Sequence, residues 1–292
     1  MRDYDLTIMT DAAMRDIQFI ILGSGTSAGV PVIGCDCDVC TSDDPRDRRT
    51  RPAACIQFTD PHGEPRIVLV DTSPDLREQV LRHKIVRCDG IIYTHNHVDH
   101  TFGLDDVRRF NAVMKKPITV YAEPHTFEHL RRVYRHIFEK EKNINDSFVA
   151  TLIPQVIGPE RALDLHGVRW TPLRLLHGRL PILGFRIEAL DRRGQVAEDQ
   201  PSPLPLAYCT DVSSVPPETW PKLTGLRTLI LDMLRYRKHP THMSVDQAIE
   251  TAEQIDAQQT FFIHMTHDIS HADLDQKLPD RMALSYDGLV LA

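Results

Sequence analysis

Short apolar runs alternate along the chain with longer stretches in which apolar residues recur at helical spacing. The short runs are rich in β-branched residues and are bounded by glycine, proline and charged residues, which is typical of strands. They predict eleven strands, at 17–22, 54–58, 66–70, 90–94, 118–121, 168–176, 182–188, 204–209, 228–231, 260–264 and 289–291. Eleven strands imply two sheets.

The stretches with helical periodicity predict helices at 74–83, 104–113, 124–139, 244–256 and 271–276. Ser244, with Gln247 three residues later, has the form of a capping box at the start of one of them. The segment 191–205 contains three prolines and several charges, and we interpret it as a solvent loop between strands. We therefore expect a single α/β (α+β) domain over 17–292, preceded by a lead-in segment, 1–16, that need not be ordered.

Composition limits the class of protein. The chain has 292 residues, of which 41% are apolar and 26% charged, as in an ordinary globular protein. Its formal net charge of −7 leaves no overall basic surface for long nucleic acid. No apolar run approaches the roughly 18 residues that cross a bilayer, and the first residues lack the features of a signal peptide. We expect a cytoplasmic protein with no membrane partner.

The tightest cluster of potential metal ligands lies directly after the predicted strand at 90–94. His95, His97, Asp99 and His100 form an H-x-H-x-D-H pattern, which aims three imidazoles and a carboxylate at one region. These ligand types suit Zn, Mn, Fe or Ni, and a pair of divalent cations is the natural occupant. The alternative is a chance cluster of surface histidines, since the chain has 15.

Three more candidate ligands follow predicted strands. They are His177, Asp211 and His264. The carboxyl ends of adjacent strands meet at one edge of a sheet, where α/β proteins bind ligands. Taken singly, each has another explanation, because Asp211 could cap a turn and the histidines could be ordinary polar residues at strand ends.

The six cysteines are unevenly distributed. Cys35, Cys37 and Cys40 lie in one short loop, whereas the other three are scattered. Without a signal peptide a disulfide framework is not expected, and three thiolates from one loop are suited to a closed tetrahedral zinc site that takes a fourth ligand from elsewhere. The alternative is a loop with incidental free thiols.

These motifs together resemble the metallo-β-lactamase-fold hydrolases, whose signature is the H-x-H-x-D-H loop. The Gly-rich turn at 23–31, followed by the cysteine loop at 34–40, looks like the branch that contains phosphoribosyl 1,2-cyclic phosphate phosphodiesterase of the carbon-phosphorus lyase pathway. The likeness extends from about residue 17 to the end of the chain. It implies a four-layer αββα sandwich of two mixed β-sheets.

The resemblance also implies a role for each candidate residue. One active-site metal, Zn or Mn, would take His95, His97 and His177, the second would take Asp99, His100 and His264, and Asp211 would bridge the two. A structural zinc would be held by Cys35, Cys37, Cys40 and His267, the second histidine of an H-x-x-H pair; His271 is the alternative fourth ligand. Asp71, which ends a predicted strand, would orient a ligand imidazole.

The resemblance further places a histidine near the phosphate. His242 fits this position best, with His239 as the alternative, and its role would be to bind a phosphoryl oxygen or to protonate the departing alkoxide. Asp99 and Asp211 would help to fix a metal-bridging hydroxide for attack on phosphorus. His242 could instead be only a solvent-exposed histidine at the start of a helix.

We therefore expect a metal-dependent phosphoric diester hydrolase that acts on a small cyclic phosphate or a nucleotide-like diester. A tRNA 3′-end-processing endoribonuclease is one alternative, but it requires a basic arm that the sequence lacks. A non-hydrolytic relative of the pyrroloquinoline quinone biosynthesis protein is another, and the intact ligand loop speaks against it. The family resemblance is compatible with a homodimer.

Overall fold

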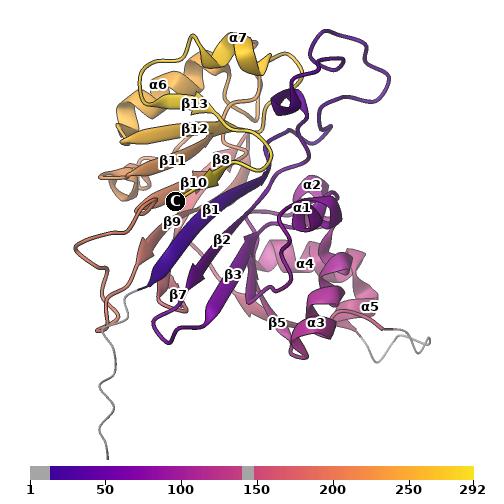
Figure 1. The fold of residues 1–292 in the computed structure, drawn as a ribbon, viewed down its shortest axis with the longest axis vertical. Coiled ribbons are helices and arrows are strands. Elements are labelled where there is room, and N and C mark those ends of the chain that lie inside the picture. Colours follow the sequence, from indigo (N-terminus) through magenta and orange to yellow (C-terminus); the bar gives the residue numbers. More distant parts are fainter. Residues whose placement is uncertain (1–13, 140–147) are drawn as a thin grey trace, which may run out of the picture.

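Two β-sheets pack face to face, and helices cover the outer side of each (Figure 1). The computed structural model describes residues 14–139 and 148–292. Each sheet has seven strands and contains both parallel and antiparallel neighbours. The predicted four-layer αββα sandwich of two mixed sheets is confirmed.

The first sheet is built mainly from the first half of the chain. Its strands have the order β14-β1-β2-β3-β4-β5-β6. Neighbours from β14 to β3 are antiparallel, and those from β3 to β6 are parallel. The strands are β1 (Arg15–Gly23), β2 (Ala53–Thr59), β3 (Pro65–Val70), β4 (Gly90–Ile92), β5 (Ile118–Ala122), β6 (Leu152–Val156) and β14 (Val290–Leu291).

The second sheet has the order β13-β12-β11-β10-β9-β8-β7. Here β10 to β13 run parallel, so that their carboxyl ends share one edge, and β7 to β10 are antiparallel. The strands are β7 (Leu163–Leu165), β8 (Val168–His177), β9 (Leu180–Ala189), β10 (Leu206–Cys209), β11 (Thr228–Asp232), β12 (Gln259–Ile263) and β13 (Met282–Leu284).

Helices complete the two outer layers. The first sheet is covered by α1 (Leu76–Arg82), α2 (Val98–Thr101), α3 (Arg108–Met114), α4 (Pro124–Val133) and α5 (Arg135–Phe138), and the second by α6 (Val245–Ile255) and α7 (His271–Asp275) (Figure 1). Short 3₁₀ turns are η1 (Pro45–Asp47), η2 (Leu104–Val107) and η4 (Trp220–Leu223). The predicted capping box of α6 is confirmed, because the Ser244 hydroxyl accepts from Gln247 N while Gln247 Oε1 accepts from Ser244 N.

The core has three parts, which correspond to the three interfaces between the layers. The central part lies between the sheets and includes the buried rings of Phe19, Trp170 and Phe185. The other two lie between each sheet and its helices. Because both faces of each sheet are covered, the strands are apolar runs with little alternation, which is how they were recognised in the sequence.

Several elements differ from the sequence-based prediction. Strands β6, β7 and β13 and helix α2 were not predicted; β6 is an edge strand with mostly exposed side chains, so it lacks a clear apolar run. The predicted helix 124–139 is interrupted at Tyr134, whose buried hydroxyl donates to Thr101 O (3.0 Å). The predicted helix 104–113 begins as a 3₁₀ turn. Most of the lead-in segment lies outside the described residues, but β1 already begins at Arg15.

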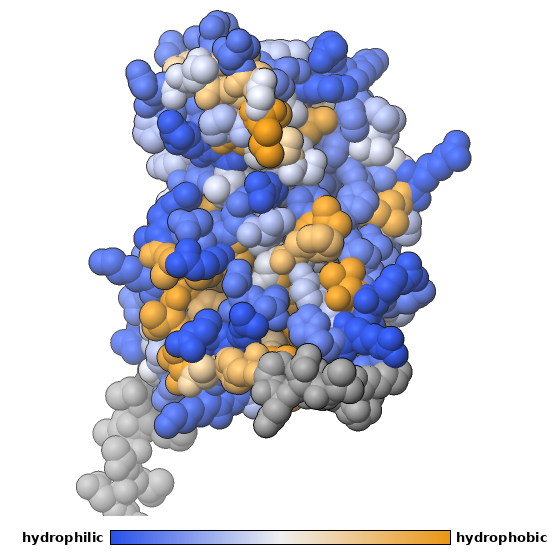
Figure 2. Space-filling model, turned by 90° about the vertical axis from the view of Figure 1, so that its right-hand side faces the viewer, coloured by the Kyte–Doolittle hydropathy of each residue, from blue (hydrophilic) through white to orange (hydrophobic). Residues whose placement is uncertain are grey.

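Seen from the side of α1 to α5, the surface is largely hydrophilic, with separate apolar patches (Figure 2). One apolar groove of about 310 Å³ lies between α1 and α3 and includes Leu81, Val86 and Val113. None of the helices in 14–139 and 148–292 has the length and apolar character to cross a membrane.

Candidate functional site

The carboxyl ends of strands from both sheets meet above the central core, and the seven predicted metal ligands lie there. The loop after β4 carries His95 and His97, and α2 follows it with Asp99 and His100. The other three residues end or follow β8, β10 and β12. The ligand atoms form two groups, each within 4.8 Å: His95, His97, His177 and Asp211, and then Asp99, His100, Asp211 and His264.

Asp211 belongs to both groups. One of its oxygens lies 3.1 Å from His100 Nε2, and the other lies 3.2 Å from His264 Nε2 and 3.9 Å from His95 Nε2. Its side chain is almost completely buried. A single carboxylate therefore stands between the two clusters, as a bridging ligand would.

Three residues at this edge have a left-handed backbone. The φ angles are 62° at Asp71, 60° at Asp211 and 66° at His264. Residues other than glycine rarely adopt this conformation, although Asp and His tolerate it better than most. Such strain is common at functional sites, and here it turns each side chain sharply at the end of its strand.

The donor set fits divalent cations. His95 Nε2, His100 Nε2 and His264 Nε2 are buried and have no hydrogen-bond partner among the described residues. Burial lowers the pKa of His95 well below its usual value and so favours the neutral imidazole, which is the form that binds metals. Burial would also lower the pKa of His100, but the carboxylates of Asp211, Asp71 and Asp99 outweigh it and raise this pKa well above the usual value. The site therefore has a strong preference for positive charge.

Other buried groups hold the ligand rings in place. Asp71, which is fully buried, lies with Oδ2 2.7 Å from His100 Nδ1, so that this ring presents Nε2 to the cluster. Asp71 also accepts hydrogen bonds from the backbone and hydroxyl of Thr94. His177 Nδ1 donates to Thr241 O over 2.7 Å, which orients the His177 ring in the same way.

His242 lies against the clusters. Its ring centroid is 4.5 Å from that of His177 and 4.6 Å from that of His264, and only 8% of the residue is exposed. The expectation that it could be a solvent-exposed helix-start histidine is therefore wrong. His239 is a neighbour whose ring centroid lies 5.3 Å from that of His242, and it is less buried.

The sequence-based prediction missed Asp232. This residue ends β11, is fully buried and lies with Oδ1 2.9 Å from His242 Nδ1. Asp232, His242 and His264 form a further group of potential ligand atoms within 4.8 Å. The signal was present, because Asp232 directly follows the predicted strand 228–231, as Asp211 follows another.

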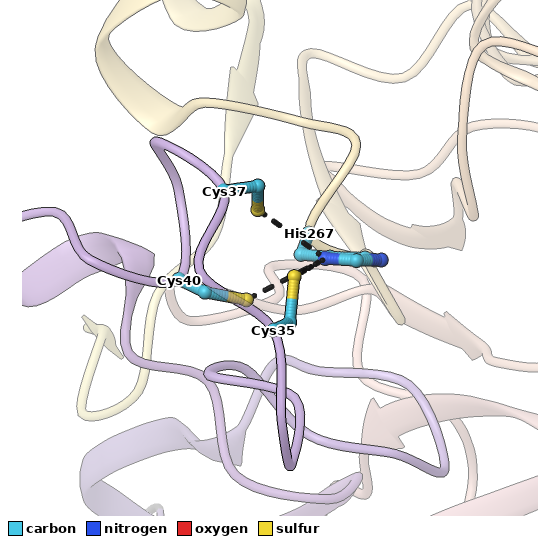
Figure 3. Close-up of side chains that lie close together, drawn as sticks. All are labelled: Cys35, Cys37, Cys40 and His267. Carbon is cyan, nitrogen blue, oxygen red and sulfur yellow. Dashed lines mark hydrogen bonds between the residues drawn. The ribbon is translucent and has the colours of Figure 1, made fainter.

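The three clustered cysteines meet His267 in the folded chain (Figure 3). His267 Nδ1 lies 3.2, 3.4 and 3.5 Å from the sulfurs of Cys35, Cys37 and Cys40. Three sulfurs and one imidazole nitrogen suit tetrahedral zinc. The backbone N–H of Cys40 helps to lower the pKa of the Cys37 thiol to about 7, which favours a thiolate.

His271, the alternative fourth ligand, lies elsewhere. Its backbone N–H donates to Asp47, and its ring packs edge-on against Tyr286, with a centroid distance of 6.0 Å. The geometry therefore favours His267.

Residues 66–265 match a family model described as a beta-lactamase superfamily domain. The chain belongs to the metallo-β-lactamase superfamily. The fold of this superfamily binds divalent metals, and most of its members are metal-dependent hydrolases.

The relatives of this chain within the superfamily have different names. The chain is 36% identical over 277 residues to an octanoyltransferase of Porphyromonas gingivalis, a match that covers 92% of this chain and 50% of that protein. It is 33% identical over 117 residues to coenzyme PQQ synthesis protein B of Methylorubrum extorquens, covering 36% of each. The chain thus spans about half the length of the first of these relatives and about a third of the second.

One of the solved structures that match this chain over nearly its whole length also shares substantial sequence identity with it. This is a diphosphatase from the PhnP family, with a TM-score of 0.81 and 38% sequence identity, and the match covers 95% of this chain and 97% of that chain.

Proposed function

We propose that this chain is a dinuclear-metal phosphodiesterase that hydrolyses a small cyclic phosphate or a nucleotide-like phosphodiester. The observation that carries the proposal is the pair of ligand groups that share Asp211, with His242 packed directly against them. The similarity to a PhnP-family diphosphatase supports phosphate chemistry.

In this proposal His95, His97 and His177 would hold one cation, Asp99, His100 and His264 would hold the other, and Asp211, which belongs to both ligand groups, would contribute to each. When bound, two divalent cations, Zn or Mn, would supply Lewis acidity for the phosphoryl oxygens and a water molecule of lowered pKa. Asp99 and Asp211 would fix the position of this nucleophile. Cys35, Cys37, Cys40 and His267 would hold a structural zinc.

The protein's own proton donor is His242. Its Nδ1 donates to the buried carboxylate of Asp232, so the other ring nitrogen, Nε2, is free to carry a proton to the leaving oxygen. The oxygen of a water molecule bonds to phosphorus while the P–O bond to the leaving group breaks and the leaving oxygen takes the proton. The products are a phosphomonoester and a free hydroxyl group, which stay on one molecule when the substrate is a cyclic phosphate. Asp232 holds the ring in a fixed orientation for this transfer.

A non-hydrolytic role, as a relative of coenzyme PQQ synthesis protein B, is the second candidate, because of the 33% identity over 117 residues. The complete ligand set favours the hydrolase. We do not propose octanoyl transfer, because the match spans only half of that relative, and the cysteines outside the cluster, Cys55, Cys88 and Cys209, are buried.

The test is a screen of the metal-loaded protein beside its Asp211→Ala variant. Substrates are bis(p-nitrophenyl) phosphate, 2′,3′-cyclic nucleotides, a ribosyl cyclic phosphate, an organic diphosphate and a tRNA precursor. We expect hydrolysis of at least one small diester, reduced by roughly 10³-fold or more in the variant. Wild-type protein that binds two metal ions at this site and cleaves no small diester would contradict the proposal.

A further inference from the structure

A cavity of about 280 Å³ lies beside His242, on the side of the cysteine cluster. Three parts of the chain form its walls. The Gly-rich turn contributes Thr26 and Ser27, the segment after β11 contributes Arg235 and His239, and the cysteine cluster contributes His267. The cavity therefore lies between His242, which packs against the candidate metal site, and His267 of the cysteine cluster.

Only one of the two ring nitrogens of His267 faces the cysteine sulfurs. Nδ1 faces the three cysteine sulfurs, and Figure 3 shows the other nitrogen pointing away from them. An imidazole that binds a metal through Nδ1 carries its proton on Nε2. His267 Nε2 makes no hydrogen bond to any other described residue, so this donor is available to a ligand in the cavity.

The backbone around His267 is held on both sides. Met265 N donates to Ser24 O (3.1 Å), and Thr266 N donates to Leu234 O (2.9 Å). The fully buried guanidinium of Arg49 donates to Thr266 O (2.8 Å). A Cβ on Gly25, in the adjoining turn, would come within 2.8 Å of Arg49 O, so only glycine permits this packing. His267 is thus fixed relative to His264, three residues earlier.

Several residues that line the cavity carry hydrogen-bond donors, and Ala28, Val32 and Leu234 form its apolar part. Besides His267, the residues Thr26 and Ser27, which carry hydroxyl groups, line it together with Arg235, whose Nε donates to Arg237 O (3.3 Å). None of the described lining residues is acidic, and none is Phe, Tyr or Trp. The lining suits a compact group rich in acceptor oxygens and provides no aromatic platform for stacking a base.

We propose that His267 is a substrate-binding residue as well as a ligand of the cysteine cluster: its Nε2–H, together with Arg235, binds the oxygen-rich group attached to the scissile phosphate. The inference rests on the proposed function, because His242 lies between the cavity and the two candidate metal sites. A phosphate at those sites would place its leaving group in this cavity. The cluster therefore helps to set substrate specificity, in addition to fixing the loop.

The decisive variant is His267→Cys. It supplies a fourth thiolate and so preserves a tetrahedral metal site while it removes the Nε2–H donor. The probes are glucose 1-phosphate and ethyl phosphate, whose affinities for the metal-loaded full chain are measured by titration calorimetry. Both present a phosphate, but only the sugar adds oxygens that reach the cavity.

We expect the wild type to bind glucose 1-phosphate at least about tenfold more tightly than ethyl phosphate, as one or two good hydrogen bonds would give. In His267→Cys the ratio of the two affinities should fall by about five- to tenfold, while the metal content stays unchanged. Arg235→Gln, which leaves the cluster intact, should do the same. Arg237→Gln is the matched control, because Arg237 is exposed on the same loop and lies outside the cavity.

An unchanged preference in both His267→Cys and Arg235→Gln, or no preference in the wild type, would overturn the inference. If His267→Cys loses its cluster metal, ¹⁵N-histidine spectra of the wild type decide: glucose 1-phosphate should shift the His267 Nε2–H signal, and an unmoved signal refutes the contact. Both readouts are independent of turnover. If the wild type hydrolyses no diester but the variants still lose the preference for glucose 1-phosphate, the proposed function is disproved and the inference about His267 stands.

Discussion

The Oδ1 atom of Asp232 lies 2.9 Å from His242 Nδ1, and Oδ2 of the same carboxylate accepts a hydrogen bond from Met243 N (3.0 Å). One fully buried carboxylate thus fixes both the ring of His242 and the backbone beside it. Because Nδ1 is engaged, only Nε2 remains for chemistry. In the proposed reaction Asp232 is therefore a positioning residue that acts through His242.

Asp232→Asn should slow the reaction most for substrates whose leaving group needs a proton from His242. We expect kcat to fall by about 10²-fold for a diester with an alkyl leaving group and by much less for bis(p-nitrophenyl) phosphate, because p-nitrophenolate departs without protonation. Steady-state kinetics on both substrates, with metal content measured in parallel, checks this.

Asp246→Asn provides the control for this variant, since Asp246 is exposed in the first turn of α6 and should leave both rates unchanged. Equal losses on the two substrates in Asp232→Asn would mean that the carboxylate supports the fold or the metals, and not proton delivery by His242.

Asp211→Ala should empty both active-site metal positions, because the same carboxylate borders both ligand groups. We expect the metal content to fall from about three ions per chain to about one, the remainder being the zinc of the cysteine cluster. Elemental analysis after dialysis measures this directly.

Asp60→Asn is the matched substitution for Asp211→Ala. Asp60 is also a buried carboxylate, but it pairs with Arg66 in the turn between β2 and β3, at the opposite end of the sheet. The Asp60→Asn variant should retain all the metal ions. Retention of about three ions in Asp211→Ala would exclude the bridging role.

Cys40→Ser should remove the proposed structural zinc and lower Tm. Cys40 contributes one of three sulfurs around His267 Nδ1, and a tetrahedral site loses most of its affinity without one thiolate. We expect a decrease of about 10 °C in calorimetry and the loss of one zinc. Cys209→Ala, at a buried cysteine outside the cluster, should keep the zinc; equal metal content in the two variants would refute the assignment.

Asp89 should make stability depend on pH. Its buried carboxylate pairs with Arg87 and Lys116. Burial alone would raise its pKa, but the hydrogen bonds from Arg87 and Ile67 N outweigh burial and lower the pKa to about 2 from 3.8. A depressed folded-state pKa stabilises the protein above pH 3.8, and this stabilisation is lost as the pH falls through about 2.

Asp89→Asn should therefore reduce the free energy of unfolding by about 2 kcal/mol at pH 6, and the difference from wild type should shrink to about half at pH 3. Urea denaturation at the two pH values measures both. A difference that is constant with pH would show that the ionised carboxylate contributes no stabilisation.

Local patterns in the sequence were sufficient to predict most of the architecture. A sheet covered on both faces needs strands that are continuously apolar, so most of the strands and the two-sheet arrangement were visible as short runs between breakers. Strands β6, β7 and β13 were missed because they are short or lie at sheet edges, where few side chains need to be apolar.

Most residues of the candidate site could also be named from the sequence, because side chains that can bind metals follow predicted strands, and the carboxyl ends of adjacent strands meet at one edge of a sheet. His242 and His267 were named from the family resemblance. The sequence by itself thus determined the types of ligand and the order in which the chain presents them. Tertiary structure alone decided that His267 and not His271 faces the cysteines, that Asp232 holds His242 and that a cavity lies between His242 and His267. These features depend on distances between segments that are remote in sequence, and such distances are set by the packing of two sheets and not by any local pattern.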